Sequence, residues 1–276
     1  MARATKTTTG TEVVDWEKEM AAQAELAAAA QRSTGGGGKF FSMKSGQLSF
    51  DNVPLPGNMM AVIVMADTME NSFYDSAYDP DTPTSPKCFA FARDEKELAP
   101  HEAVDNDPYF VRQHDTCNGC PQNEWGSART GRGKACANVM RLAMIPAGTY
   151  TKGAGRAAGL ELTMIDDEEH YEKADPGFMK LSVLNVKGYA NYVRGLAAEM
   201  KRPPHGVFTN VSVEPDAKSQ FKVIFEVIGA VPNNLMATVM KRHKLIEDAI
   251  GFPYTPPQEK EEPKKPANTK LTRGRR

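Results

Sequence analysis

Four cysteines are the residues whose types and spacing most directly indicate chemistry in this chain. Cys117 and Cys120 are separated by an Asn-Gly pair, and a two-residue spacer allows both sulfur atoms to point at one metal ion. Cys136 follows them, and Cys88 precedes them. Structural zinc takes four ligands in a tetrahedron and prefers thiolates. The pattern therefore predicts a zinc ion held by Cys88, Cys117, Cys120 and Cys136.

Other kinds of cysteine site compete with this interpretation. A redox Cys-x-x-Cys pair normally opens a helix in a βαβ unit, but here Pro121 follows Cys120 in a predicted loop. A disulfide is disfavoured, because the cysteines are too few for the dense framework of a secreted protein. His101 or His114 remains an alternative to Cys88 as the fourth ligand. Four protein ligands leave no position for a reactive water, so the predicted role of the zinc is structural.

No other stretch of the sequence matches a catalytic motif. Gly131 to Lys134 is not a phosphate loop, because that loop requires Ser or Thr after the lysine and Ala135 stands there. The acidic run Asp166 to Glu169 is explained better as a solvated loop than as a metal site. We find no Ser/His/Asp arrangement and no paired carboxylates, and we therefore expect a protein that is not an enzyme.

Basic and aromatic residues gather in two stretches. Residues 111–141 hold five Lys or Arg against two acidic residues, and residues 180–202 hold five against one. Cations that contact phosphates and flat rings that stack on bases are the components of a groove for single-stranded nucleic acid. Tyr189 lies on the apolar face of a predicted helix and is assigned to the core, and Trp125 either stacks on bases or packs over the cysteine loop. The candidate contacts are Trp125, Arg129, Arg132, Lys134, Arg141, Lys187 and Arg194.

Short β-type runs dominate the elements that must position these residues. Apolar runs and alternations predict strands near 40–41, 48–50, 59–65, 87–93, 139–145, 160–165, 179–184, 207–213 and 221–228. Helical spacing predicts helices over 186–201 and 235–250. Residues 94–135 show no periodicity, and the cysteines are expected to fasten them. The strands do not alternate with helices, so the predicted class is mainly β (α+β), with a closed or partly open antiparallel barrel.

The domain organisation follows from composition. The chain has 276 residues and a net charge of −1. We expect a helical or flexible arm over 1–38, a folded domain over 39–253 with a zinc subdomain at about 86–142, and a disordered Lys/Glu/Pro-rich tail over 254–276. The tail holds seven Lys or Arg against three Glu, so the rest of the chain carries a net negative charge. A nucleic-acid surface on the folded domain therefore requires an uneven charge distribution.

No apolar run reaches the length of a membrane span and no signal peptide is recognisable, which predicts an intracellular protein without a membrane partner.

Several blocks of the sequence carry a family resemblance that covers about residues 39–230. They are Pro86 to Phe91, Cys117-Asn118-Gly119-Cys120-Pro121, Asn123 to Ser127, Gly131 to Cys136 and Arg141-Leu142, with Leu55 to Asn58 and Tyr189 to Leu196 fitting as well. They resemble a phage-encoded, zinc-containing family of single-stranded DNA-binding proteins. The resemblance implies binding of single-stranded DNA during phage replication or recombination, in the cytoplasm of the infected host cell, with phage replication or recombination proteins as partners.

A more distant likeness is to zinc-containing helix-destabilising proteins of tailed phages. It implies an OB-like antiparallel barrel with an inserted zinc-binding loop. Such proteins typically end in an acidic tail that recruits partners, whereas this tail is net basic, so the tail is expected to touch nucleic acid instead. The alternative function is a zinc-stapled interaction or scaffolding protein of a phage complex, in which the loop presents Trp125 to a protein.

Overall fold

The computed structural model describes residues 39–43, 46–51, 53–77, 79, 84–153, 159–217 and 219–257. The predicted arm (1–38) and residues 258–276 of the predicted tail lie outside the described residues. Within them, ten strands form one sheet: β1 (Lys39–Ser42), β2 (Ser49–Phe50), β3 (Val53–Pro54), β4 (Met59–Phe73), β5 (Cys88–Ala92), β6 (Cys136–Lys152), β7 (Leu160–Met164), β8 (Gly177–Ser182), β9 (Val207–Asp216) and β10 (Gln220–Ala230). The helices are α2 (Ala103–Asn106), α3 (Glu168–Lys173), α4 (Val183–Gly195) and α5 (Asn233–Ala249), with the short turns η2 (Pro56–Asn58), η3 (Glu95–Glu97), η4 (Pro121–Asn123), η5 (Leu196–Met200) and η6 (Pro204–Gly206).

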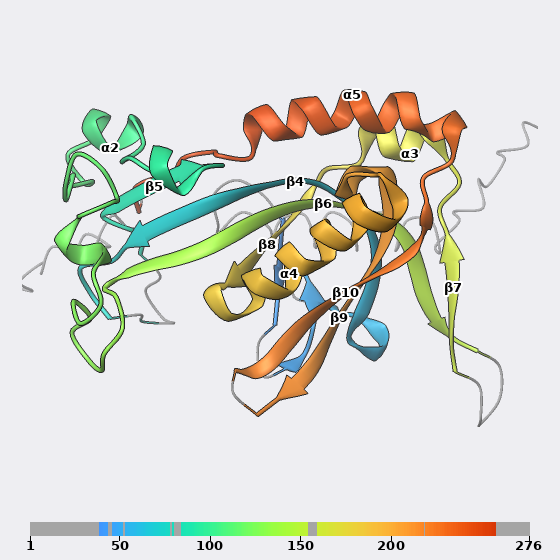
Figure 1. Cartoon of the computed structure of the whole chain (residues 1–276), viewed down its shortest axis with the longest axis horizontal. Helices are drawn as coiled ribbons and strands as arrows, with labels where there is room; N and C mark the ends of the chain where they lie inside the picture. The colour runs from blue at the N-terminus through green and yellow to red at the C-terminus, as the bar shows by residue number, and fades with distance from the viewer. Residues whose placement is uncertain are drawn as a thin grey trace, which may run out of the picture. The chain divides into compact units, whose positions relative to one another are not determined.

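A long antiparallel ribbon of β4 and β6 forms the spine of the sheet (Figure 1). The strand order is β10-β9-β4-β6-β8-β1-β2-β3, with β5 added to β4 and β7 added to β6. The pairs are antiparallel except for β1 with β8, which is parallel. β9 pairs with the first residues of β4, and β5 pairs with the last. One end of the ribbon therefore lies at the middle of the sheet, and the other carries β5 and the loops around the cysteines.

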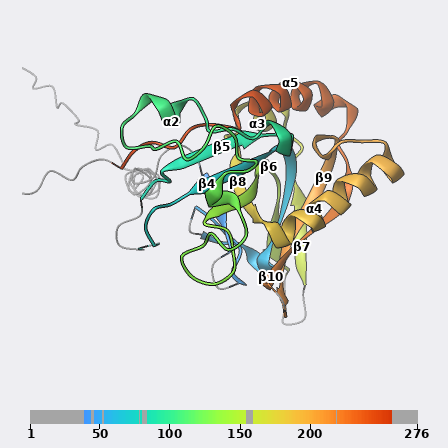
Figure 2. The same ribbon diagram turned by 60° about the vertical axis from the view of Figure 1, so that its left-hand side comes forward.

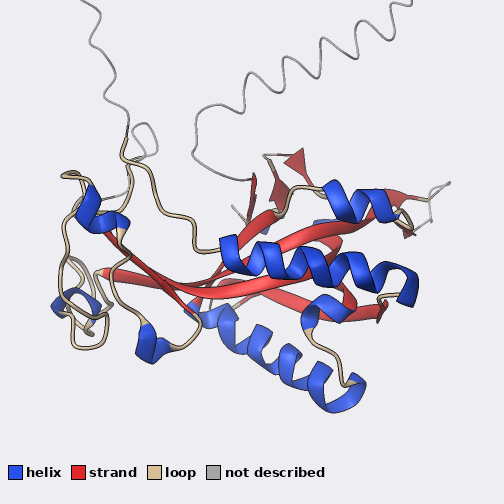
Figure 3. Cartoon of the chain, turned by 90° about the horizontal axis from the view of Figure 1, so that it is seen from above, coloured by secondary structure: helices blue, strands red, loops and turns tan. Residues whose placement is uncertain are grey.

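Both faces of the spine are covered. On one face Ile63, Ile145 and their neighbours pack under α3 and α5, while on the other Val64 and Met144 pack under α4. Figure 3 shows the long helix α5 lying along the sheet. Because successive side chains of a strand point to opposite faces, a strand covered on both sides must be apolar throughout, as the first half of β4 is.

The sheet curls into a half-barrel around the second of these cores (Figure 2). Phe41 and Leu48 from one end of the strand order share this core with Val223 from the other end. Helix α4 covers the edge strand: Asn185 Oδ1 accepts a hydrogen bond of 3.0 Å from the backbone N–H of Val223. This contact satisfies a donor that an edge strand would otherwise expose.

The coarse prediction of a mainly-β (α+β) fold is confirmed as a mixed α+β fold dominated by this curled sheet. The predicted strands are present, but β4 continues to Phe73 and β6 starts at Cys136. These extensions carry Asp, Glu and Asn, which have low strand propensity, and cross-strand pairing over the whole ribbon stabilises them instead.

The predicted solvated acidic loop over 166–169 is confirmed in its exposure, but it is wrong at Glu168 and Glu169, which begin a helix. Asp167 Oδ1 accepts a hydrogen bond of 3.0 Å from Glu169 N, and Glu168 and Glu169 occupy the first turn of α3. A capping aspartate and carboxylates near a helix N-terminus both stabilise it. The buried Tyr171 fixes the helix on the body through a bond from its hydroxyl to Ile165 O.

The predicted start of the disordered tail is also wrong by a few residues. The chain after α5 continues as an ordered segment over 250–257, in which Phe252 and Tyr254 pack against the β4–β6–β8 side chains. Thr255 O accepts a hydrogen bond of 2.5 Å from Ser85 Oγ. No helix in the described part of the chain is long and apolar enough to cross a membrane.

Two stacked histidines make the fold sensitive to acid. The rings of His205 and His243 lie 3.8 Å apart with 17° between their planes, and His243 Nε2 lies 3.6 Å from Glu247, which also pairs with Arg93. Burial, and then repulsion from His243, lowers the pKa of His205 to about 4. A histidine whose pKa is lower in the folded state stabilises the fold above about pH 6.5 and loses that contribution as the pH falls toward 4.

We therefore expect the His205→Phe variant, which keeps a stacked ring but cannot titrate, to lose less stability between pH 7 and pH 5 than the native chain. The expected difference is on the order of 1 kcal/mol, after allowing for the partial exposure of the ring. Urea unfolding at the two pH values measures it. An equal loss in both proteins would show that His205 is not responsible.

Candidate functional site

Two strands place Cys88 and Cys136 on either side of one residue. Cys88 of β5 and Cys136 of β6 are both directly across from Phe73 at the end of β4. Directly opposite residues of paired strands point to the same face of the sheet. The two cysteines therefore lie on one face, at the same end of the ribbon.

The other two cysteines are held in a tight turn. Gly119 has φ +79°, a conformation that residues with a Cβ rarely adopt. Asn123 closes the turn from both sides: its backbone N–H donates to Cys120 O at 2.8 Å and its Nδ2 donates to Cys117 O at 2.9 Å. Cys117 N donates to Leu98 O at 2.9 Å, which ties the turn to the body.

All four predicted ligands line one pocket, together with His114 and side chains of β4 and β5. Burial raises the pKa of Cys88 and Cys117, and it raises the pKa of Cys136 to about 12, with the neighbouring thiols adding to each shift. The structure thus brings the four cysteines together. As their side chains are arranged, no group of three or more His, Cys, Asp or Glu in the described residues could hold a metal ion, so coordination requires the thiols to turn toward one another.

The two alternative histidine ligands lie in different places. His101 stacks on the ring of Phe89, and its Nδ1 accepts a bond of 3.1 Å from Ala103 N. His114 lines the cysteine pocket and contacts the Thr116 backbone through Nδ1. His114 is therefore the histidine placed to exchange with a cysteine, while His101 belongs to the packing around Phe89.

The loop that follows the cysteine turn is fixed internally and presents a tryptophan. Ser127 Oγ accepts from Ala135 N at 2.9 Å and donates to Glu124 O at 2.7 Å, which pins the two sides of the loop together. Trp125, in this loop, is 80% exposed. The side chain does not pack over the cysteine turn, which was the alternative interpretation of the sequence.

The predicted cations of the loop are accessible to different degrees. Arg129 and Arg132 are exposed, and Arg129 donates to the backbone oxygen of Asp75. Lys134 is partly buried, and its Nζ lies 3.3 Å from Asn123 Oδ1, the same amide group that closes the cysteine turn. Lys134 therefore links the cation set to the cysteine turn.

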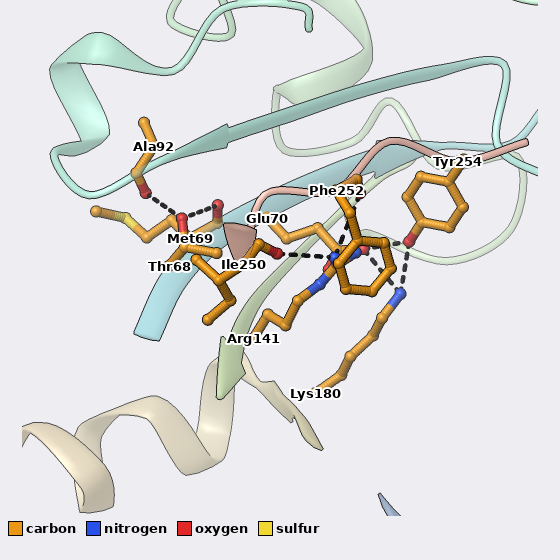
Figure 4. Close-up of polar contacts among 9 residues, drawn as sticks. All are labelled: Thr68, Met69, Glu70, Ala92, Arg141, Lys180, Ile250, Phe252 and Tyr254. Atoms are coloured by element: carbon orange, nitrogen blue, oxygen red, sulfur yellow. Dashed lines mark hydrogen bonds and ion pairs between the residues drawn. The ribbon is translucent and has the colours of Figure 1, made fainter. Parts of the chain in front are cut away.

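The structure contradicts the prediction that Arg141 contacts a ligand. Arg141 is 1% exposed and its Nε donates to Glu70 Oε2 at 2.7 Å. Its Nη1 donates to Ile250 O at 3.1 Å, and its guanidinium lies over the Phe252 ring at 4.2 Å (Figure 4). The cation lies inside the fold, on the face of the sheet that α5 and the C-terminal segment cover.

Arg141 belongs to a buried polar cluster that the sequence did not reveal. Lys180 Nζ donates to Glu70 Oε1 at 2.8 Å, and the Tyr254 hydroxyl donates to the same oxygen. Burial alone would raise the pKa of Glu70, but attraction to Lys180 and Arg141 outweighs burial and lowers it. The cluster is a structural clasp between the sheet and the C-terminal segment.

The two cations predicted on the later helix are exposed on α4. β8 runs toward the cysteine end of β6, with Ser182 opposite Val139, so α4 begins near the cysteine pocket. Met140 packs under α4, and Asn138 and Cys136 share its face by two-residue periodicity. The Trp125 loop and α4 therefore emerge on the same side of the ribbon.

The first turn of α4 adds two residues that the sequence interpretation missed. Val183 is 62% exposed and Leu184 is 67% exposed. The sequence interpretation assigned both residues to a predicted strand over 179–184, and this was wrong because the strand ends at Ser182 and the helix starts at Val183. We define the contact face as these two residues with the predicted residues of the loop and α4 that are exposed or, for Lys134, partly exposed. The set is Trp125, Arg129, Arg132, Lys134, Val183, Leu184, Lys187 and Arg194.

Comparison of the chain with protein-family models, with curated proteins and with solved structures gives no significant match.

Proposed function

We propose that this chain binds single-stranded DNA without catalysis, through the contact face, and that a zinc ion in the cysteine pocket holds that face in position. The observation that carries the proposal is the exposed Trp125 on a fixed loop beside cations. A tryptophan that served only in packing would be shielded from solvent by its neighbours, whereas the Trp125 side chain is 80% exposed. Flat rings and cations on one surface are what binding of single strands requires.

The zinc supports the contact face through its connections. Asn123 joins the turn of Cys117 and Cys120 to Lys134, and Asn138 Nδ2 donates to the same Asn123 oxygen at 2.9 Å. A zinc ion bound by four thiolates would supply no catalysis, only a fixed link between the loop and both strands. The small hydrophobic core beside the cysteine pocket contains Phe89, Val104 and Phe110. We infer that this core is too small to order residues 94–135 without the zinc ion.

The biological setting in this proposal comes from the sequence resemblance. We assign the curled sheet to an OB-like DNA-binding barrel with an inserted zinc loop, acting in phage DNA replication or recombination in the cytoplasm of the infected host cell. Its partners are then single-stranded DNA and phage replication or recombination proteins. The half-barrel sheet, with α4 packed on its edge strand β10, supports this assignment.

Binding to fluorescein-labelled oligothymidylate at two salt concentrations tests the proposal. We expect affinity that falls as salt rises, because phosphate contacts release counterions. The Trp125→Ala variant is expected to lose about 1–3 kcal/mol of binding free energy, the usual value of one base–aromatic stack. No binding at low salt, or binding without salt dependence, would contradict the proposal.

A matched pair of charge variants makes the test specific to the face. Lys187→Glu lies on the contact face, while Lys244→Glu makes the same change at an exposed position of α5, on the opposite face of the sheet. We expect the first to weaken binding several-fold more than the second. Equal effects would show that the DNA responds to net charge and not to this face.

A second candidate function is protein interaction, favoured by the exposed apolar side chains of Trp125, Val183 and Leu184. Exposed apolar residues that gather on one face commonly mark a protein interface. In that case alanine variants of these residues would disrupt a complex that survives nuclease treatment. The Lys187→Glu variant would leave such a complex largely intact.

A further inference from the structure

An open groove lies at the far end of α4 from the cysteine pocket. Its walls are formed by Val193, Ala197, Lys201, Arg202, Pro203 and Pro204, and its volume is about 470 Å³. This volume falls in the range of about 300–1,000 Å³ that small-ligand sites occupy. The lining is mostly apolar, with one exposed cation at Lys201.

A change in helix geometry builds the groove. The last turn of α4 widens into the π-helical turn η5, which ends at Lys201 in the left-handed conformation (φ 55°). π-turns inside helices frequently occur at functional sites. The Arg202 side chain is fixed by two hydrogen bonds, since its Nη1 donates to Gly206 O at 3.1 Å and to Val231 O at 3.2 Å. The part of the groove that Arg202 lines is therefore held in position.

Positively charged side chains are spaced along α4 from the contact face to the groove. Lys187 and Arg194 are exposed, and Lys201 follows at the groove. Among residues 183–202, Glu199 is the one acidic residue in the sequence. A polyanion that runs along this helix would meet cations at both ends and in the middle.

We propose that this groove is a second base-binding subsite for single-stranded DNA, with the strand running along α4 between Trp125 and the groove. The inference rests on the proposed function. The flat face of a base would pack against the apolar walls and the two prolines. The Lys201 ammonium group would bind a flanking phosphate. The helical stretch from Val183 through Met200 contains eighteen residues, which corresponds to roughly 27 Å of helix.

The test uses a matched pair of substitutions at adjacent exposed positions of η5. Ala197→Glu places a carboxylate in the groove, whereas Ala198→Glu adds the same charge to the same turn at a position that does not line the groove. We expect Ala197→Glu to weaken binding of a 16-nucleotide oligothymidylate about tenfold more than Ala198→Glu, which is about 1.4 kcal/mol. For a 4-nucleotide oligomer, too short to reach both subsites, we expect a difference of at most about twofold.

The outcomes separate the two proposals. Equal affinities of the two variants for the long oligomer, with wild-type binding intact, would overturn the groove subsite and leave the contact face standing. Absence of binding by the wild-type chain would overturn both. Lys201→Ala gives an independent check, because loss of one phosphate contact is expected to reduce the salt slope by about one, and an unchanged slope would count against the subsite. Far-ultraviolet circular dichroism confirms that each variant is folded.

Discussion

Replacing Arg141 with alanine is expected to destabilise the folded chain by about 3–5 kcal/mol, because the change leaves the buried Glu70 carboxylate without one of its two cationic partners. Glu70 is fully buried, and after the substitution it keeps the ion pair with Lys180 and the hydrogen bond from the Tyr254 hydroxyl. The substitution also removes the donor to Ile250 O, so the C-terminal segment loses an anchor. Urea unfolding monitored by circular dichroism measures the loss.

The comparison variant for this prediction is Lys180→Ala. The Lys180 side chain is 32% exposed, so its loss is expected to cost less than the loss of Arg141. If Arg141→Ala left stability within about 1 kcal/mol of the native value and weakened DNA binding instead, the buried assignment would be wrong and the sequence prediction of a phosphate contact would be right.

The same cluster has a pH dependence of known sign. Because the pKa of Glu70 is lowered in the folded state, its contribution to stability is present above the unfolded value of about 4.3 and is lost as the pH falls through the lowered value. Glu70→Gln is therefore expected to flatten the acid limb of the stability curve.

Removing zinc is expected to unfold the cysteine subdomain while leaving the curled sheet intact. Structural zinc contributes roughly 10–16 kcal/mol of apparent binding free energy in small zinc domains, more than the small core of Phe89, Val104 and Phe110 can replace. We expect one zinc per chain by metal analysis of the purified protein. After chelation, hydrogen exchange should accelerate over residues 94–135 and change little in β9 and β10.

A cysteine variant provides the control for chelation. Cys117→Ser is expected to lower the zinc content and to reproduce the exchange pattern of the chelated native chain. Chelation of this variant should then have little further effect, because both changes act on the same ion. Zinc-free protein with unchanged exchange over this segment would contradict a structural metal. Zinc content that depends on His114→Ala but not on Cys88→Ser would establish the histidine as the fourth ligand.

The sequence predicted the elements that carry apolar periodicity. The run of residues 59–65, the hairpin of β9 and β10 and the two long helices repeat their apolar residues at the spacing of their secondary structure. The second half of β4 lacks that pattern. Its polar residues are in a strand because β5 and β6 flank them, which depends on residues far away in the sequence.

The candidate site divides in the same way. The Cys117 and Cys120 spacing is local, so the sequence could indicate that turn, and the pocket includes both more distant cysteines. Arg141 shows the limit of this reasoning. Its charge suggested a surface contact, whereas Glu70 lies across the ribbon and Phe252 comes from beyond α5. Neither neighbour could be assigned to Arg141 from spacing along the chain.

The groove beyond α4 was missed for a related reason. Helical spacing predicted one continuous helix over residues 186–201. In the structure the widened last turn occurs where Leu196 is buried and Arg202 bonds to Gly206 O and Val231 O, residues that lie outside the helix. Spacing along the sequence does not distinguish an α-helical last turn from a π-helical one.

Fluorescence of Trp125 during a DNA titration tests the central claim most directly. The chain contains two tryptophans, so the Trp16→Phe variant leaves Trp125 as the single reporter. Its exposed ring is predicted to be quenched by oligothymidylate in a saturable manner, and added salt is predicted to restore the signal. DNA that fails to bind, or that binds by anisotropy without changing Trp125 fluorescence, would contradict the contact face.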